Sequence, residues 1–289
     1  MPSPTTRDPG LKRRLRHPLR TVAEWGTKYP FAPSYRRRDR RWITTVDGVR
    51  LRVAIVPGPP RPEFAIVLAH GFSNSSRAPR IHQFAHLLAR RAVVIVPDLR
   101  GHRRSGGDCT LGLLEPLDIA ASVALANEVA PGIPIVTVGT SLGGVASLLH
   151  AGAFGRHQGI AGTVVVSTPA WWGSTDRAAS ERLDKMVGSA KGQWVLRWLL
   201  YTRVSCEIAV PIAEVVVGNI APAFTIVVHD PDDTFFGPEH AETIYGWAGE
   251  PKALWWVPKG GHGTDILTVA FADRVLEEVA RRLVASTTR

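Results

Sequence analysis

The stretch that decides the fold is Pro134-Ile-Val-Thr-Val-Gly139, which runs directly into Thr140-Ser141-Leu142-Gly143-Gly144. Its first half is apolar and rich in β-branched residues, which is typical of a buried strand, and its second half contains a Gly-x-Ser-x-Gly sequence. Glycines two residues before and after Ser141 allow a tight turn from strand to helix and a close approach of the neighbouring chain. Because such a turn exposes one hydroxyl, the stretch predicts a nucleophilic serine at position 141.

Around this stretch, from Trp42 onward, short apolar runs alternate with helical stretches. This alternation is typical of an α/β fold in which helices cover a mostly parallel sheet. Apolar residues at helical spacing predict one helix over 81–88 and another over 267–279. We expect an eight-stranded sheet with strands at 42–46, 50–56, 64–69, 92–97, 134–138, 162–167, 223–229 and 252–257.

Length and composition agree with one large α/β domain. The chain has 289 residues, of which 45% are hydrophobic and 21% charged, so it can bury a sizeable core. It has no apolar run of the roughly 18 to 20 residues that span a bilayer and no secretory signal at its N-terminus, so we expect cytoplasmic residence. Its two cysteines, Cys109 and Cys206, lack metal-ligand spacing, and we expect neither a disulfide framework nor a metal or cofactor.

The net charge of +10 is concentrated at the N-terminus. Residues 1–41 hold twelve of the 35 basic residues and three of the 25 acidic ones, which leaves 23 bases against 22 acids in residues 42–289. The globular part therefore has no basic excess to bind a phosphate backbone, and nucleic acid is not an expected partner. We interpret residues 1–41 as a basic arm and residues 42–289 as the folded domain.

Within the arm, Leu11, Leu15, Leu19 and Val22 keep a near-helical spacing that places them opposite the arginines. One interpretation is an amphipathic segment that makes a peripheral contact with an anionic membrane surface. The other is an extension whose charges are simply solvated. Neither the choice between them nor the oligomeric state follows from the sequence.

The interval 169–222, between the sixth and seventh expected strands, is too long for a simple crossover. It is rich in aromatic residues: Trp171, Trp172, Trp194, Trp198 and Tyr201. We expect a small helical lid insertion there, because open α/β sheets bind ligands at the carboxyl ends of their strands. The aromatic residues either line an acyl pocket or pack the added helices onto the body, and the sequence leaves both open.

A serine alcohol needs a base and an orienting carboxylate to become a good nucleophile. His262 lies on a glycine-flanked loop after the last expected strand, where a neutral imidazole can reach a serine and accept its proton. The loop Asp230-Pro231-Asp232-Asp233 follows strand 223–229 and offers the carboxylate. We predict Asp233 as the acid, with Asp232 as the alternative.

Backbone donors for a negatively charged oxygen are expected at two places. The buried strand 64–69 ends in His70-Gly71-Phe72, a turn that can direct the N–H of Phe72 toward the serine. The N–H of Leu142, at the start of the helix after the serine, can point to the same spot. Phe72 and Leu142 are therefore the predicted oxyanion-hole residues.

With these residues in place, the chain resembles the α/β-hydrolase superfamily, and within it the branch of monoacylglycerol lipases and serine aminopeptidase-like hydrolases. The resemblance covers roughly residues 42–285. It rests on five motifs in order: His70-Gly71-Phe72, Asp98-Leu-Arg-Gly-His-Arg-Arg-Ser105, Gly139-Thr-Ser-Leu-Gly143, the acid loop at 230–234, and Gly261-His262-Gly263. It implies an α/β-hydrolase fold with Ser141, Asp233 and His262 as nucleophile, acid and base, and with Phe72 and Leu142 at the oxyanion positions.

Three positions depart from the family pattern. Asp230 stands where the acid loop usually has glycine, and Pro238 comes one residue later than the usual proline, which keeps the choice between Asp232 and Asp233 open. Arg103 replaces a glycine in the loop after the fourth strand, where it can alter the rim of the pocket. We expect Asp98 and Arg100 to brace that loop rather than to catalyse.

The predicted function is a serine hydrolase that cleaves a carboxylic ester with a hydrophobic acyl group, through an acyl-enzyme on Ser141. Thioester or amide cleavage by the same residues is the nearest alternative. Dehalogenase or epoxide-hydrolase chemistry is disfavoured, since those relatives have a carboxylate in place of the serine. A non-catalytic binding protein on this fold is the alternative from a different class.

Overall fold

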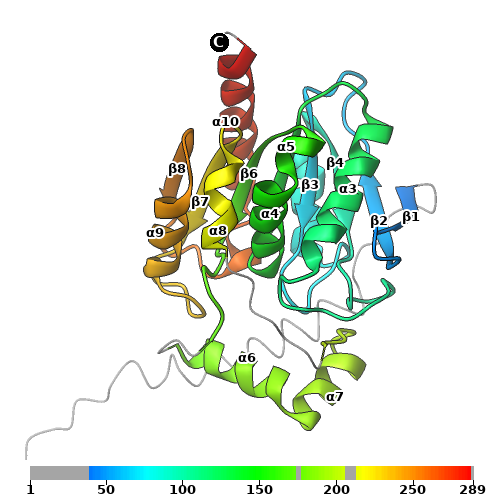
Figure 1. The fold of residues 1–289 in the computed structure, drawn as a ribbon, viewed down its shortest axis with the longest axis vertical. Coiled ribbons are helices and arrows are strands. Elements are labelled where there is room, and N and C mark those ends of the chain that lie inside the picture. The colour runs from blue at the N-terminus through cyan, green and yellow to red at the C-terminus, as the bar shows by residue number, and fades with distance from the viewer. Residues whose placement is uncertain (1–38, 174–176, 206–212, 288–289) are drawn as a thin grey trace, which may run out of the picture.

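The computed structural model describes residues 39–173, 177–205 and 213–287 (Figure 1). The predicted basic arm, residues 1–41, lies outside these residues except for its last three positions, and Cys206 also lies outside them. Cys109 is buried, as expected for an incidental thiol. Within the described part of the chain, every helix is too short or too polar to cross a membrane.

The described residues form the predicted eight-stranded sheet, in the order β1-β2-β4-β3-β5-β6-β7-β8. The pairs β1–β2 and β2–β4 are antiparallel, and all the others are parallel. The strands are β1 Arg40–Thr44, β2 Arg50–Val56, β3 Phe64–Ala69, β4 Ala92–Pro97, β5 Ile135–Thr140, β6 Ile160–Val166, β7 Phe224–His229 and β8 Lys252–Trp256. The predicted α/β architecture is confirmed.

Three strands differ from the prediction by about two residues. β1 begins at Arg40 instead of Trp42, because an edge strand tolerates charged residues that a central strand excludes. β6 begins at Ile160 instead of Gly162. β5 continues to Thr140, so the strand ends directly before Ser141.

Helices cover both faces of the sheet. On one face, α2 (Pro79–Leu88) and α10 (Val269–Thr287) share an apolar core in which the rings of Phe84 and Phe271 stack at 5.8 Å. On the other face lie α3 (Glu115–Val129), α4 (Leu142–Ala153) and α9 (Pro238–Trp247). The inner parallel strands are buried on both sides, which explains their continuous apolar runs.

The interval between β6 and β7 carries added helices, as predicted. They are α6 (Ala178–Gly188), α7 (Ala190–Trp198), the short α8 (Glu214–Val217) and a 3-10 turn, η2 (Gly218–Ile220). Figure 1 shows α6 and α7 beyond one end of the sheet, apart from the helices on its faces. This is the end reached by the carboxyl termini of the parallel strands, so α6 and α7 cover the edge that holds Ser141.

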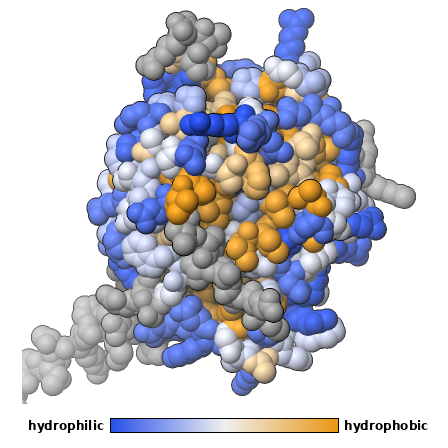
Figure 2. Space-filling view, viewed as in Figure 1, coloured by the Kyte–Doolittle hydropathy of each residue, from blue (hydrophilic) through white to orange (hydrophobic). Residues whose placement is uncertain are grey.

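The surface is mixed in character. Figure 2 shows hydrophobic residues gathered near the middle of one face and mainly hydrophilic residues along its margins. Several aromatic side chains of the insertion are exposed, with Trp194 at 56%, Trp198 at 60% and Tyr201 at 52% of their full accessible area. These three side chains are therefore not enclosed in a buried pocket.

Candidate active site

Ser141 occupies a strained turn between β5 and α4. Its backbone φ angle is +50°. Residues other than glycine rarely adopt this conformation, and when they do it is often at functional sites. Its N–H donates to the carbonyl of Val166, at the end of β6, over 2.8 Å. The serine is 8% exposed, so its hydroxyl lies just below the surface at the carboxyl edge of the sheet.

The glycines around Ser141 are needed for space. A Cβ atom on Gly139 would lie 2.2 Å from the carbonyl oxygen of Gly143, and one on Gly143 would lie 2.4 Å from the carbonyl oxygen of Ala69. A Cβ on Gly71 would lie 3.3 Å from the Cβ of Ser141. Close approach of backbone segments therefore explains the Gly-x-Ser-x-Gly sequence and brings the His70-Gly71-Phe72 loop against the serine.

The His262 ring contacts a buried carboxylate. Its Nδ1 lies 2.7 Å from Oδ2 of Asp233, whose side chain is fully buried, whereas the His262 side chain is 17% exposed. The other carboxylate oxygen accepts the N–H of Phe235 over 2.7 Å. Of the two carboxylates that the sequence left open, Asp233 makes the contact and Asp232 is exposed to solvent.

Asp233 is held in its ionised form. Burial raises the pKa of this carboxyl, but the charge of His262 and the hydrogen bonds from His262 and Phe235 outweigh it, and the pKa lies below its ordinary value. An ionised Asp233 that accepts from Nδ1 fixes the tautomer of His262 with a bare Nε2. That nitrogen is then available as a base.

Two side chains that sequence analysis did not assign to the site tie its loops together. The Ser167 hydroxyl accepts the N–H of Gly263 over 2.9 Å, and Asp230 Oδ2 accepts the N–H of Gly261 over 2.7 Å. Both residues flanking His262 are thus anchored. Asp230 Oδ1 also accepts the N–H of Asp232 over 3.0 Å, so this carboxylate joins its own turn to the histidine loop.

Ser141 and His262 are anchored to adjacent residues of the chain. Val166 accepts the N–H of Ser141, and Ser167 accepts the N–H of the residue after His262. Across the described residues, no hydrogen bond joins the Ser141 hydroxyl to the His262 ring. The serine–histidine contact therefore stays a prediction, and the shared anchor at the end of β6 is what places the two residues near each other.

The predicted oxyanion residues belong to two segments that adjoin Ser141. Leu142 is the first residue of α4 and is fully buried, and the first N–H groups of a helix have no partner within it. Phe72 is half-buried in the loop after β3, with its ring edge-on to His102 at 6.0 Å. Phe72 follows Gly71, whose backbone lies close to Ser141, and its role as an oxyanion donor stays a prediction.

Two buried histidines hold the loop that carries Phe72. His70 Nε2 accepts the N–H of Leu99 over 3.0 Å, and His102 Nε2 accepts the N–H of Ser73 over 3.1 Å. In each ring Nδ1 lies 2.8 Å from a carbonyl oxygen, so each imidazole is neutral. Burial lowers the pKa of His70 to about 4; burial and the neighbouring His70 lower that of His102 to about 3.

Asp98 and Arg100 brace the loop after β4, as expected. Asp98 is buried and accepts the N–H of Ser76 over 2.7 Å. Arg100 is buried between two carboxylates, with Nε 2.9 Å from Asp118 Oδ1 and Nη1 2.8 Å from Asp47 Oδ2. Both side chains therefore join this loop to neighbouring segments.

An apolar cluster lies between the inserted helices and Ser141. Leu142 is part of it, together with Val187 of α6 and Leu196 of α7, and Phe72 and Met186 pack against it. Its lining is mostly aliphatic. Of the tryptophans that sequence analysis considered for an acyl pocket, Trp172 packs on this cluster.

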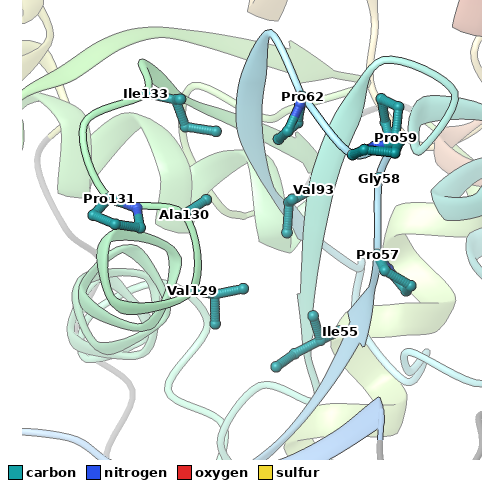
Figure 3. A pocket seen from close by; sticks show the side chains of 11 residues that line it. Ile55, Pro57, Gly58, Pro59, Pro62, Val93, Val129, Ala130, Pro131 and Ile133 are labelled. Carbon is teal, nitrogen blue, oxygen red and sulfur yellow. The ribbon is translucent and has the colours of Figure 1, made fainter.

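A shallow pocket at the other end of the sheet is separate from these residues (Figure 3). Its lining includes Val93, near the start of β4, and Ile133, before β5, so it lies at the amino ends of the parallel strands. Pro57, Pro59 and Pro62 form much of its wall. None of the described residues that line it is a predicted catalytic residue.

Comparisons with known proteins bear on the family and the fold of this chain. The model of the Alpha/beta hydrolase family matches residues 66–286. The uncharacterized protein YfhR of Escherichia coli K12 is 27% identical over 239 residues, which cover 80% of this chain and 74% of YfhR. None of these matches selects a branch of the family, so the monoacylglycerol lipase and aminopeptidase-like branch stays a prediction.

Solved structures with the same fold include two esterases. The Pyrococcus furiosus esterase Pf2001 superposes with a TM-score of 0.66 at 18% identity, covering 88% of this chain and 97% of that one. The esterase RhEst1 from Rhodococcus sp. ECU1013 superposes with a TM-score of 0.60 at 21% identity, covering 86% and 99%. At these identities the likeness establishes the fold.

Proposed function

This chain belongs to the alpha/beta hydrolase family, and we propose that it is a serine hydrolase that cleaves carboxylic esters through an acyl-enzyme on Ser141. The observation that carries the proposal is the hydrogen bond between His262 and the buried Asp233, at the sheet edge that holds the strained Ser141. The esterases among its structural neighbours favour the same chemistry.

In the first half of the reaction, Ser141 Oγ attacks the ester carbonyl carbon while His262 Nε2 takes the hydroxyl proton. The carbonyl oxygen becomes negatively charged and accepts the N–H groups of Phe72 and Leu142. Asp233 stabilises the imidazolium. When the intermediate collapses, the bond to the alcohol breaks, His262 returns its proton to the leaving oxygen, and the acyl group remains on Ser141.

In the second half, a water molecule replaces the alcohol. His262 takes a proton from this water, whose oxygen attacks the acyl carbon and regenerates the oxyanion. Collapse of this intermediate releases the carboxylic acid and returns the proton to Ser141. No group outside the protein other than water is needed to balance the reaction.

The proposed acyl group is hydrophobic. Leu142, one of the proposed oxyanion residues, belongs to the aliphatic cluster beneath α6 and α7, and Phe72 packs on it. An acyl chain whose carbonyl lies at these two N–H groups would therefore lie against this apolar cluster, to which Met186, Val187 and Leu196 belong. Each methylene group buried there adds about 0.8 kcal/mol of favourable transfer free energy.

The test is a series of p-nitrophenyl esters with acyl chains of increasing length. We expect kcat/KM to rise with chain length as more methylene groups contact the cluster, and Ser141→Ala to reduce it at least about a thousandfold. The matched control is Ser122→Ala on α3, where the buried hydroxyl donates to the carbonyl of Asp118; we expect it to keep wild-type activity. If Ser141→Ala retains more than about a thousandth of the wild-type rate, the covalent mechanism is wrong.

Thioesters and amides are the alternative substrates on the same residues. Matched thioesters and anilides of the preferred acyl chain distinguish them in one experiment. If the thioester is cleaved and the oxygen ester is not, the protein is a thioesterase. If none of the three substrates is cleaved and a fluorophosphonate fails to label the protein, the serine-hydrolase proposal is rejected in favour of a non-catalytic binding protein.

A further inference from the structure

The inserted helices α6 and α7 lie beyond the carboxyl edge of the sheet (Figure 1) and are joined to the body by two kinds of contact. After α7, residues 201–205 run beside the loop that follows β4. The N–H of Arg203 donates to the carbonyl of Gly101, and the N–H of Cys109 donates to the carbonyl of Arg203, both over 2.8 Å. The N–H of Ser205 donates to the carbonyl of Cys109 over 2.9 Å. Backbone hydrogen bonds therefore fix the segment that follows α7.

The start of α6 is joined to the body through a side chain. Arg177 directly precedes Ala178, the first residue of α6, and its Nη1 donates to the carbonyl oxygen of Asp233 over 2.9 Å. The two residues are 56 positions apart in the chain, and the bond between them is partly buried. This contact connects the first inserted helix directly to the residue that we propose as the catalytic acid.

Asp233 also has a partner at each of its other polar atoms. Its N–H donates to the carbonyl of Asp230 over 3.0 Å, Oδ1 accepts the N–H of Phe235, and Oδ2 contacts His262. Arg177 binds the remaining atom, the carbonyl oxygen. A guanidinium group that donates to an oxygen makes a charge-assisted hydrogen bond, which is stronger than one between neutral groups. Arg177 thus completes the hydrogen bonds that Asp233 makes in the acid loop.

The helix that follows Arg177 contributes to the apolar cluster that contains Leu142. Val187 belongs to this cluster, and Leu183 and Met186 pack against it. Their spacing of three and four residues places these three side chains on one face of α6. We call this face the α6 wall. Because Leu142 directly follows the proposed nucleophile, the α6 wall is one side of the proposed acyl site.

The anchor and the α6 wall lie at opposite ends of one helix. The carbonyl of Arg177 accepts the N–H of Glu181 over 3.2 Å, so the residue that holds the anchor is also part of the first turn. At a rise of about 1.5 Å per residue, Val187 lies about 15 Å along the helix axis from Arg177. An α-helix of three turns is stiff, so a contact that fixes its first turn also restricts where the α6 wall lies.

The two inserted helices are joined into one unit at their common corner. Ser189, between them, accepts the N–H of Gly192 over 3.1 Å with its hydroxyl and caps α7. The side chain of Gln193 donates to the carbonyl of Val187 over 3.1 Å, which ties the end of α6 to the first turn of α7. The unit is therefore held by backbone contacts after α7 and by the Arg177 side chain before α6.

We propose that Arg177 is a positioning residue that holds the α6 wall against the acyl chain of the substrate, so that the preference for long acyl chains depends on it. The proposal rests on the ester hydrolysis proposed above and names the residue that sets its acyl selectivity. Loss of the guanidinium would free the start of α6 and leave the contact between Asp233 and His262 in place. Binding of the acyl chain would weaken, and the chemical step would not.

The experiment compares Arg177→Met with the wild type on p-nitrophenyl acetate and p-nitrophenyl octanoate. Methionine keeps a long unbranched side chain and removes the guanidinium donors. We expect kcat/KM on the octanoate to fall about tenfold, as for the loss of one charge-assisted hydrogen bond, and the change to appear in KM. On the acetate, kcat/KM should stay within about threefold of the wild type, because its acyl group has a single methyl group to place against the α6 wall. A general loss of stability would lower both values alike.

Hydrogen–deuterium exchange gives a second measurement that does not depend on catalysis. In Arg177→Met, the amides of α6 should exchange faster than in the wild type, because the start of the helix has lost its anchor. The amides of residues 201–205 should exchange at the wild-type rate, since their backbone contacts are unchanged.

The matched control is Arg156→Met. The guanidinium of Arg156 also donates to backbone carbonyls, those of Asn219 over 3.2 Å and Ala221 over 2.7 Å, but it lies before β6, at the amino ends of the parallel strands. This variant should keep both kcat/KM values within about threefold of the wild type and leave exchange in α6 unchanged. If Arg177→Met does not fold, Arg177→Gln, whose amide extends less far than a guanidinium, replaces it with the same expectations.

Several results would overturn the proposal. An equal loss on both esters would show that Arg177 acts on the acid or on the fold as a whole. Octanoate hydrolysis at the wild-type kcat/KM, or wild-type exchange in α6, would show that Arg177 does not hold the α6 wall. If exchange in α6 is faster in Arg177→Met but the wild type cleaves neither ester, the anchor on α6 is confirmed, and ester hydrolysis and the acyl selectivity that rests on it are rejected.

Discussion

Acid should destabilise this fold through two buried histidines, His70 and His102. Their pKa values in the folded protein are about 4 and about 3, against an ordinary value of 6.5. Between these values and 6.5 the unfolded chain binds protons that the folded chain does not, so stability is lost as the pH falls below 6.5. A shift of one pKa unit corresponds to about 1.4 kcal/mol.

The shifts set the size of the effect. When the pH falls from 7 to 4, each histidine should lower the free energy of unfolding by about 3 kcal/mol. Each ring uses Nε2 to accept a backbone N–H, at Leu99 for His70 and at Ser73 for His102. Protonation would turn that acceptor into a donor, which is why the folded protein resists it.

The measurement is urea unfolding followed by tryptophan fluorescence between pH 7 and pH 4. His102→Gln removes the titrating group, and its amide oxygen can still accept the N–H of Ser73. From pH 7 to pH 4, the loss in free energy of unfolding should be about 3 kcal/mol smaller for His102→Gln than for the wild type. The exposed His157→Gln variant is the control and should follow the wild type. If His102→Gln loses as much stability as the wild type, the buried neutral imidazole is not the cause.

Three further predictions concern the site and the segments that support it. Asp233→Asn should lower kcat/KM about ten-thousandfold in an ester assay, whereas Asp232→Asn should stay within about twofold of the wild type, since only Asp233 contacts His262; the reverse order would reject the assignment. Gly143→Ala should reduce the free energy of unfolding by more than about 3 kcal/mol in urea, because its Cβ would lie 2.4 Å from a backbone oxygen, whereas Gly246→Ala in α9 has no atom within 4 Å and should be neutral or stabilising. Arg100→Met should cost about 3 to 5 kcal/mol by the same measurement because it leaves Asp118 buried without its partner, and a loss below about 1 kcal/mol would contradict that view.

The sheet could be predicted because its parallel strands are buried on both faces and therefore read as continuous apolar runs. The runs at 64–69 and 92–97 match β3 and β4 at both ends. The edge strand β1 was harder to predict from the sequence. Its pairing with β2 begins at Arg40, and a charged residue at a solvent-exposed edge gives no strand signal in the sequence.

The candidate catalytic residues could be predicted where they lie in recognisable sequence motifs. The order of Ser141, Asp233 and His262 follows from the turns after three strands, but the choice between Asp232 and Asp233 depends on which carboxylate is buried. Ser167 and Asp230, which hold the histidine loop, could not be predicted from sequence motifs. Ser167 holds the N–H of a residue 96 positions away, and no local pattern marks a serine after a strand as a partner for a distant loop.

The most direct test of the account is peptide mass spectrometry after reaction with a fluorophosphonate, which traps an activated serine as a stable adduct. We predict one adduct per chain on the peptide that contains Ser141, and at least a hundredfold slower labelling in His262→Ala, because the imidazole must take the hydroxyl proton. An adduct on another residue, or equal labelling rates in His262→Ala and the wild type, would contradict the proposal that His262 activates Ser141.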